Sequence, residues 1–167
     1  MAASEDELLI NDREHVLLFN LTTIVDETPI PELIEWKTNL DGKIVDLHYS
    51  SHFEIFFLLT DEKLFSYQRT SSLVCLYRFT SMPWSCTTMS DDIYLLFKYS
   101  LVVEKWTLDP ASTSIRMNRQ WNLNELISVC EHDQHLRSIR SNPSQNQLAI
   151  LIVRQEVIQF ESVALVI

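Results

Sequence analysis

A pair of short apolar runs joined by a polar turn occurs four times in this sequence and limits the folds that it can adopt. In residues 52–68 it reads HFEIFFLLTDEKLFSYQ, with a run, the turn TDEK and then alternation. The other copies read ELLINDREHVLLFNL, DIYLLFKYSLVVEKWTL and NQLAILIVRQEVIQFES. Runs of five to eight residues rich in Val, Ile, Leu and aromatics, broken by polar turns, are typical of β-hairpins. The sequence therefore predicts an all-β fold.

The second strand of each hairpin places an aromatic residue three positions after an aliphatic one. The pairs are Val16 and Phe19, Leu64 and Tyr67, Val103 and Trp106, and Val157 and Phe160. A further apolar strand follows each hairpin, as ELIEWKT, LVCLYRF, SIRMNRQW and a stub ALVI at 164–167. Another precedes three of them, as KIVDLHYS, PWSCTTMS and LRSIRSNP. The repeat unit is therefore four strands.

Four-stranded repeats of about 40 to 45 residues resemble the blades of the WD40-repeat family. That family ends the third strand of a blade in Trp-Asp. The matching positions here hold Phe19-Asn20, Tyr67-Gln68, Trp106-Thr107 and Phe160-Glu161, and no Gly-His pair occurs. The resemblance is one of period and strand order, and it implies a β-propeller-like fold.

The repeats divide the chain into one partial propeller. Residues 5–40 are expected to form an incomplete blade, 43–80 and 83–122 two whole blades, and 136–167 a second incomplete blade. We therefore expect about three to four four-stranded antiparallel blades forming an open arc. An open arc leaves apolar faces and strand edges uncovered, so we also expect self-association, with a lost C-terminal half or another copy completing the ring.

Charge and composition exclude several classes of partner. The chain has 167 residues and a net charge of -10, and one Gly rules out Gly-rich phosphate-binding loops. Acidic chains repel nucleic acid and anionic lipid, so neither is expected as a partner. Three cysteines without a CxxC pair favour a reducing compartment, and we expect the thiols to be reduced and mostly buried. The sequence has no apolar stretch long enough to cross a bilayer and no secretory signal. A cytosolic or nuclear protein is therefore expected, and we take it to be cytoplasmic.

Candidate sites are few. Cys130, His132 and His135 lie in the tract CEHDQH, but their spacing matches no established zinc site, and a solvated loop is expected. The preceding NLNELISV is expected to be a short helix capped by Asn122 or Asn124. No residue is assigned as catalytic, cofactor-binding or metal-binding.

Three further hypotheses concern catalysis by histidines, an anion patch of arginines and a ligand site of tryptophans. Catalysis at His48 and His52 lacks an assignable nucleophile, so these are expected to be core or turn residues. An anion patch would need Arg116 and Arg119 on one face, whereas a three-residue step in a strand places them on opposite faces. Arg137 and Arg140 would complete that patch. The tryptophans are expected between sheets rather than on a ligand, and they are Trp36, Trp84, Trp106 and Trp121.

The function most consistent with these features is a non-enzymatic protein-interaction scaffold that needs no cofactor. It would bind other proteins on its loops or at the mouth of the channel. Two alternatives remain: a ligand-binding or catalytic propeller completed by further blades, and the substrate-recognition part of a ubiquitin ligase, which rests on analogy.

Overall fold

The computed structural model describes the chain outside a set of short segments. The segments not described are residues 13, 14, 24–29, 70, 71, 98, 110–113, 127–133, 143, 145, 155–159 and 167. For residues 23, 38, 39, 126, 134–137, 152–154 and 160–166 the backbone alone is described.

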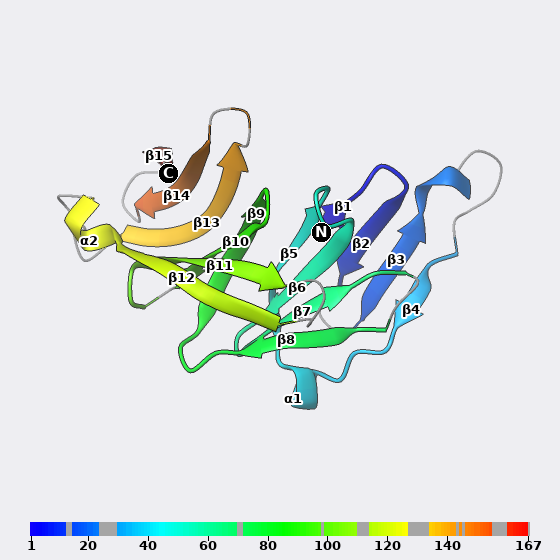
Figure 1. Ribbon diagram of the computed structural model, residues 1–167. Coiled ribbons are helices and arrows are strands. Elements are labelled where there is room, and N and C mark those ends of the chain that lie inside the picture. Colours follow the sequence, from blue (N-terminus) through cyan, green and yellow to red (C-terminus); the bar gives the residue numbers. More distant parts are fainter. Residues whose placement is uncertain are drawn as a thin grey trace.

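The described strands form four antiparallel sheets that follow one another around an open arc (Figure 1). We call these sheets blades 1 to 4. Blade 1 contains β1 (Ala2–Ala3), β2 (Glu7–Asn11), β3 (Val16–Asn20) and β4 (Glu32–Ile34), and blade 2 contains β5 (Ile44–Ser50), β6 (Ile55–Thr60), β7 (Lys63–Tyr67) and β8 (Val74–Arg78). Blade 3 contains β9 (Pro83–Met89), β10 (Asp92–Phe97), β11 (Val102–Asp109) and β12 (Ser114–Asn122), and blade 4 contains β13 (Gln134–Asn142), β14 (Gln147–Arg154) and β15 (Phe160–Val166). Short helical turns occur at η1 (Leu21–Thr23), α1 (Thr38–Asp41) and α2 (Leu123–Leu126).

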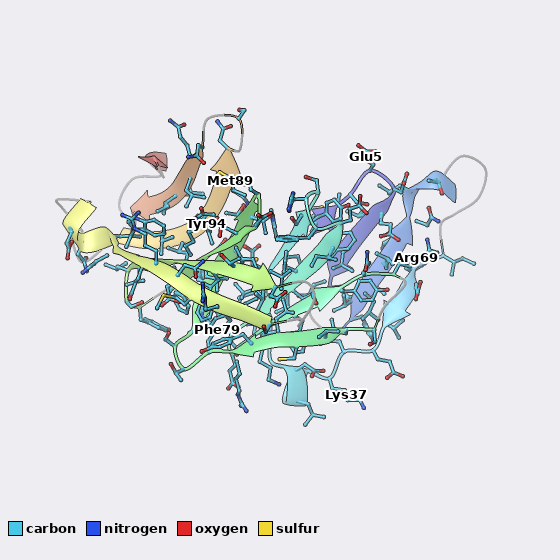
Figure 2. All side chains as sticks on the ribbon, viewed as in Figure 1. Glu5, Lys37, Arg69, Phe79, Met89 and Tyr94 are labelled. Atoms are coloured by element: carbon cyan, nitrogen blue, oxygen red, sulfur yellow. The ribbon has the colours of Figure 1, made fainter. Side chains whose placement is uncertain are left out.

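Three apolar cores fill the spaces between successive blades. Because alternate residues of a strand point to opposite faces, each middle blade contributes one set of side chains to the core before it and another to the core after it. In β10, Ile93 and Leu95 join the core with blade 2, whereas Tyr94 and Leu96 join the core with blade 4. Figure 2 shows side chains filling the space between the sheets, with Phe79, Met89 and Tyr94 labelled.

The all-β, open-arc architecture predicted from the repeats is confirmed. Two details of the end blades differ from expectation. Blade 1 was expected to lack its first strand, but the two-residue β1 pairs with β2 and supplies it. Residues 164–166 were expected to begin a separate fourth strand of the last blade, but they continue β15, which pairs with β14 from Phe160 to Val166.

A β-bulge in β12 overturns the expectation that Arg116 and Arg119 lie on opposite faces. Arg116 pairs with Thr107 and Arg119 pairs with Lys105, and the register shifts between Lys105 and Trp106. Since Thr107 and Lys105 are two residues apart, their partners share one face of the sheet. The extra residue of the bulge is what strict alternation could not foresee.

The turn before blade 2 depends on the single glycine. Gly42 has φ 92°, and a Cβ there would lie 2.7 Å from Asp61 Oδ1 and 2.9 Å from Thr60 Oγ1. The neighbouring hairpin turn is held by Thr60 Oγ1, which accepts hydrogen bonds from the main-chain N–H groups of Glu62 and Lys63. At the other end of the arc, Asn122 Oδ1 accepts a hydrogen bond from Asn124 N and caps α2, as predicted for one of these asparagines.

Candidate functional site

The first candidate site lies where the edge strands β5, β9 and β13 of three successive blades meet. On the face of β5 that points to blade 3, Asp46 and His48 accept main-chain N–H bonds from β9. On the face of β9 that points to blade 4, Ser85 and Thr87 do the same for β13. The hydrogen-bonded N–H groups belong to Cys86, Thr88, Ile139 and Ser141, with donor–acceptor distances of 3.0 to 3.2 Å. We call this series of bonds the inner relay.

Asp46, Ser85 and Arg140 form the centre of the inner relay. Ser85 Oγ donates to Asp46 Oδ2 at 2.6 Å, and the same serine oxygen accepts from Ile139 N at 3.2 Å and from Arg140 Nη1 at 3.1 Å. Arg140 Nη1 also lies 3.3 Å from Asp46 Oδ2. A serine hydroxyl has one proton to donate and two lone pairs, so all three positions on Ser85 are occupied. These contacts join blades 2, 3 and 4.

His48 is held in its neutral form by its contacts. Thr88 N donates to His48 Nε2 at 3.1 Å, so this ring nitrogen must be unprotonated. Burial lowers the pKa of His48 to about 4, with a smaller contribution from Arg140 that outweighs the opposing effect of Asp46. An imidazole with that pKa, whose Nε2 is already an acceptor, is a weak base. The geometry therefore gives His48 a structural task, in line with the expectation of a core residue.

Of the other residues in the sequence hypotheses, His52, Cys130, His132 and His135, only His52 has a described side chain. His52 Nε2 lies 2.6 Å from Asp91 Oδ1 on the surface, in a contact between the turns of blades 2 and 3. Cys130 and His132 lie outside the described residues, and only the backbone of His135 is described, in β13. Within the part of the chain that the structure describes, no three His, Cys, Asp or Glu side chains are grouped to hold a metal ion.

Of the two cysteines that the structure describes, one is buried as expected and the other is exposed. Cys86 is buried, and burial raises the pKa of its thiol well above the usual range. Cys75 is exposed, because it lies on the outer strand β8. The two described thiols thus have opposite accessibilities.

Among the described side chains, the arginines of the hypothesised anion patch do not converge. Arg119 lies over the ring of Trp121, 4.8 Å from its centroid, on the outer strand of blade 3. Arg140 lies on β13 and pairs with Asp46. The side chain of Arg137 is outside the described set. The structure thus places Arg119 and Arg140 in separate environments, although the bulge brings Arg116 to the face of Arg119.

Three of the four tryptophans pack in or against the cores, as predicted. Trp106 lies in the core between blades 2 and 3, and Trp121 packs against the core between blades 3 and 4 and stacks on Tyr94. Trp36 packs edge-on against Phe65, and its Nε1 donates to Gly42 O at 3.2 Å. Trp84 is half-buried.

The second candidate site is an open recess of about 620 Å³ between the turns of blades 1 and 2. Its rim is acidic, with Glu5, Asp6, Glu7 and Glu54, and it includes Arg69, which lies 3.6 Å from Glu7 Oε1. Figure 2 labels Glu5 and Arg69 at this end of the arc. We call this feature the acidic recess.

Tyr49 lines the acidic recess, and its pKa responds to the burial and the charges there. Burial raises the pKa of Tyr49, and four carboxylates add to the rise in the order Glu54, Glu7, Glu5 and Asp6. Neither this recess nor the inner relay could be found from the sequence, because each joins residues of different blades.

Comparison with known proteins shows the fold. No protein-family model matches the sequence, and no curated protein matches it. Among solved structures, AztD from Citrobacter koseri matches with a TM-score of 0.60 and 10% identity over 99% of this chain and 46% of that chain. The N-terminal domain of Nup159 matches with a TM-score of 0.56 and 12% identity over 99% of this chain and 43% of that chain. The fold is of the β-propeller type.

Two further matches differ in what their names describe. The luciferin-regenerating enzyme matches with a TM-score of 0.62 and 9% identity over 99% of this chain and 60% of that chain. A structure of S. cerevisiae Dbp5 bound to Nup159, Gle1, IP6 and ADP matches with a TM-score of 0.54 and 11% identity over 96% of this chain and 41% of that chain. The present chain spans less than half the length of AztD and of the Nup159 domain. In the described residues no helix is both long and apolar enough to cross a lipid bilayer.

Proposed function

We propose that this chain is a divergent WD40-like scaffold that binds another protein at the acidic recess and performs no chemistry. The single observation that carries the proposal is that turns from two blades form an open recess with a volume of about 620 Å³. Loops displayed at one end of a rigid β-scaffold are common binding surfaces. The match to Nup159, which is found bound to Dbp5, supports this use of the fold. We also propose that the protein acts in the cytoplasm.

The chemistry of the rim suggests what the partner presents. Four carboxylates against one guanidinium favour a positively charged segment, such as a loop carrying Lys or Arg. Arg69 is half-exposed and contacts Glu7 and Glu32 at 3.6 and 4.0 Å, so it can exchange these long ion pairs for a carboxylate of the partner. Rim charges of this kind increase association rates and select partners by charge.

The proposal is tested by photo-crosslinking from an unnatural residue placed at position 51. Ser51 is exposed and lines the acidic recess. We expect defined protein adducts that disappear in Glu5→Lys/Glu54→Lys. The matched control is Glu35→Lys/Glu125→Lys, which makes the same change in charge at exposed positions outside the recess. Adducts that survive the recess variant, or the absence of any protein adduct, would rule the proposal out.

An enzymatic role is the second candidate, since the luciferin-regenerating enzyme shares the fold and the inner relay holds a serine and a carboxylate 2.6 Å apart. Against it, Ser85 is 1% exposed and its hydroxyl is fully hydrogen-bonded. We expect a fluorophosphonate probe for activated serines to leave Ser85 unlabelled. Labelling that disappears in Ser85→Ala would instead favour catalysis.

A further inference from the structure

We propose that the outer edge of blade 3 binds an acidic, extended segment of another protein as a fifth strand beside β12. This surface is separate from the acidic recess, so the inference goes beyond the proposed function. β12 is the last strand of its sheet, on the side opposite β9, and no other described strand pairs with its outer edge (Figure 1). Such an edge presents main-chain N–H and C=O groups with which an added peptide can pair.

β12 is the longest outer strand among blades 1 to 3. It has nine residues, whereas β4 has three and β8 has five. Outer strands are often kept very short, which prevents pairing with other chains. Seven of the nine side chains of β12 are exposed, so a partner can reach both faces of the strand as well as its edge.

The β-bulge in β12 directs two guanidinium groups to one face. Arg116 pairs with Thr107 and Arg119 with Lys105, so both lie on the face toward blade 4. Asn118 is the extra residue, and its Nδ2 donates to Thr107 Oγ1. A bulge disfavours pairing with the flat edge of another folded sheet, whereas a flexible peptide can follow the kink. The occupant that fits this edge is therefore a peptide segment.

The charges on this face favour an acidic segment. Among the described residues, neither Arg116 nor Arg119 lies within ion-pair distance of a carboxylate. Asp92 lies on the same face, but Lys105 Nζ is 2.6 Å from its Oδ2 and Thr107 Oγ1 donates to its Oδ1. β12 itself contains no acidic residue. A chain of net charge -10 thus carries a positive strip here, and guanidinium groups bind carboxylates strongly.

The opposite face of β12 is apolar where it is exposed. Met117 pairs with Trp106 and is 45% exposed. The ring of Tyr77 in blade 2 lies 4.7 Å from the ring of Trp106 and is 39% exposed. Since the side chains of a strand alternate between its faces, the added strand carries acidic residues on one face and apolar residues on the other.

This combination distinguishes a peptide from other anionic partners. Neither nucleic acid nor lipid has a polypeptide backbone that pairs with the edge of a sheet. Both are also extended anionic surfaces, which a chain of net charge -10 repels. A short peptide brings only a few carboxylates, and charges more than about 8 Å away are largely screened at physiological ionic strength.

The experiment is fluorescence anisotropy with a labelled peptide of about eight residues, within the usual length of a strand, in which Glu and Val alternate. We expect wild type to bind it. Arg116→Glu/Arg119→Glu should bind at least about tenfold more weakly, because two attractions become repulsions. The matched control is Lys37→Glu/Lys43→Glu, which makes the same change in charge at exposed positions outside β12 and should bind as wild type does.

Two further peptides test the wild-type chain without any substitution. One is methylated at every main-chain nitrogen, so it keeps its charges but cannot donate to a strand edge. The other has Lys in place of Glu. We expect neither to bind at β12, whereas the original peptide should slow amide hydrogen exchange in this strand.

Several results would overturn the proposal. Wild type that does not bind the Glu–Val peptide would remove its basis, and equal binding of the methylated peptide would show a contact between charges without an added strand. Equal losses in the β12 variant and the lysine control would show that net charge alone decides. Binding to phosphatidylserine vesicles in place of the peptide would assign the arginines to a membrane. Because the acidic recess repels this probe, its failure would leave the proposed function standing.

Discussion

Ser85 Oγ lies 2.6 Å from Asp46 Oδ2, in a hydrogen bond between two residues 39 positions apart that joins blade 2 to blade 3. The serine oxygen also accepts from Ile139 N in blade 4. One hydroxyl thus connects three successive blades, and its removal has consequences in all of them.

Ser85→Ala is expected to lower the free energy of unfolding by about 1–3 kcal/mol. The change leaves the buried Ile139 N–H without its acceptor and removes one of the three hydrogen bonds that Asp46 Oδ2 accepts, and an unsatisfied buried group carries that cost. Urea denaturation followed by tryptophan fluorescence measures it. Ser81→Ala, at an exposed serine, should change stability by less than about 0.5 kcal/mol. Equal effects for both variants would contradict a special role for Ser85.

His48 is expected to make stability depend on pH between about 4 and 6.5. Its pKa is about 4 in the folded chain and 6.5 when unperturbed, so between these values the unfolded chain binds the extra proton. The stabilisation is complete above pH 6.5 and is lost as the pH falls toward 4, amounting to about 3 kcal/mol at most. Thermal unfolding at a series of pH values should show this slope.

His48→Gln removes the titrating ring and should flatten this part of the pH profile. Gln68→Asn, at an exposed position that carries no titrating group, is the control and should leave the slope as in wild type. A profile unchanged by His48→Gln would mean that the carboxylates alone set the acid sensitivity.

Gly42→Ala is expected to destabilise the chain by more than about 1 kcal/mol, because φ is 92° and the added Cβ would crowd Thr60 and Asp61. Gly42→Asn separates the two causes. Asparagine tolerates positive φ, so only the crowding would remain. Since Thr60 is fully buried, we expect the asparagine variant to lose nearly as much stability as the alanine variant in urea titrations. A near-neutral asparagine variant would assign the cost to φ alone.

Thiol labelling should distinguish the two described cysteines. Cys75 is exposed and is expected to react rapidly with a maleimide in the folded chain, whereas the buried Cys86, whose pKa is raised by burial, should react only after unfolding. Mass spectrometry of labelled peptides at neutral pH gives the two rates directly. Comparable rates would show that blades 2 and 3 separate readily.

The repeating hairpins were visible in the sequence because strand length, turn composition and apolar alternation are local properties. Three features were not visible. The strand at Ala2 and Ala3 is two residues long and has weak β-propensity, so no pattern indicates it. The bulge beside Trp106 adds one residue without any change in composition. The inner relay depends on which strands become neighbours after folding, and nothing in the chain near Asp46 specifies Ser85.

The inner relay also shows how much variation in residue type a joint between blades tolerates. A carboxylate, an imidazole and two hydroxyls, on Asp46, His48, Ser85 and Thr87, all perform the same task of accepting a main-chain N–H. Any short polar side chain with a lone pair satisfies this requirement, so the inner positions can drift among unlike residues while the joint persists. The joints between these blades therefore constrain the geometry of the inner positions more than the identity of the residues that occupy them.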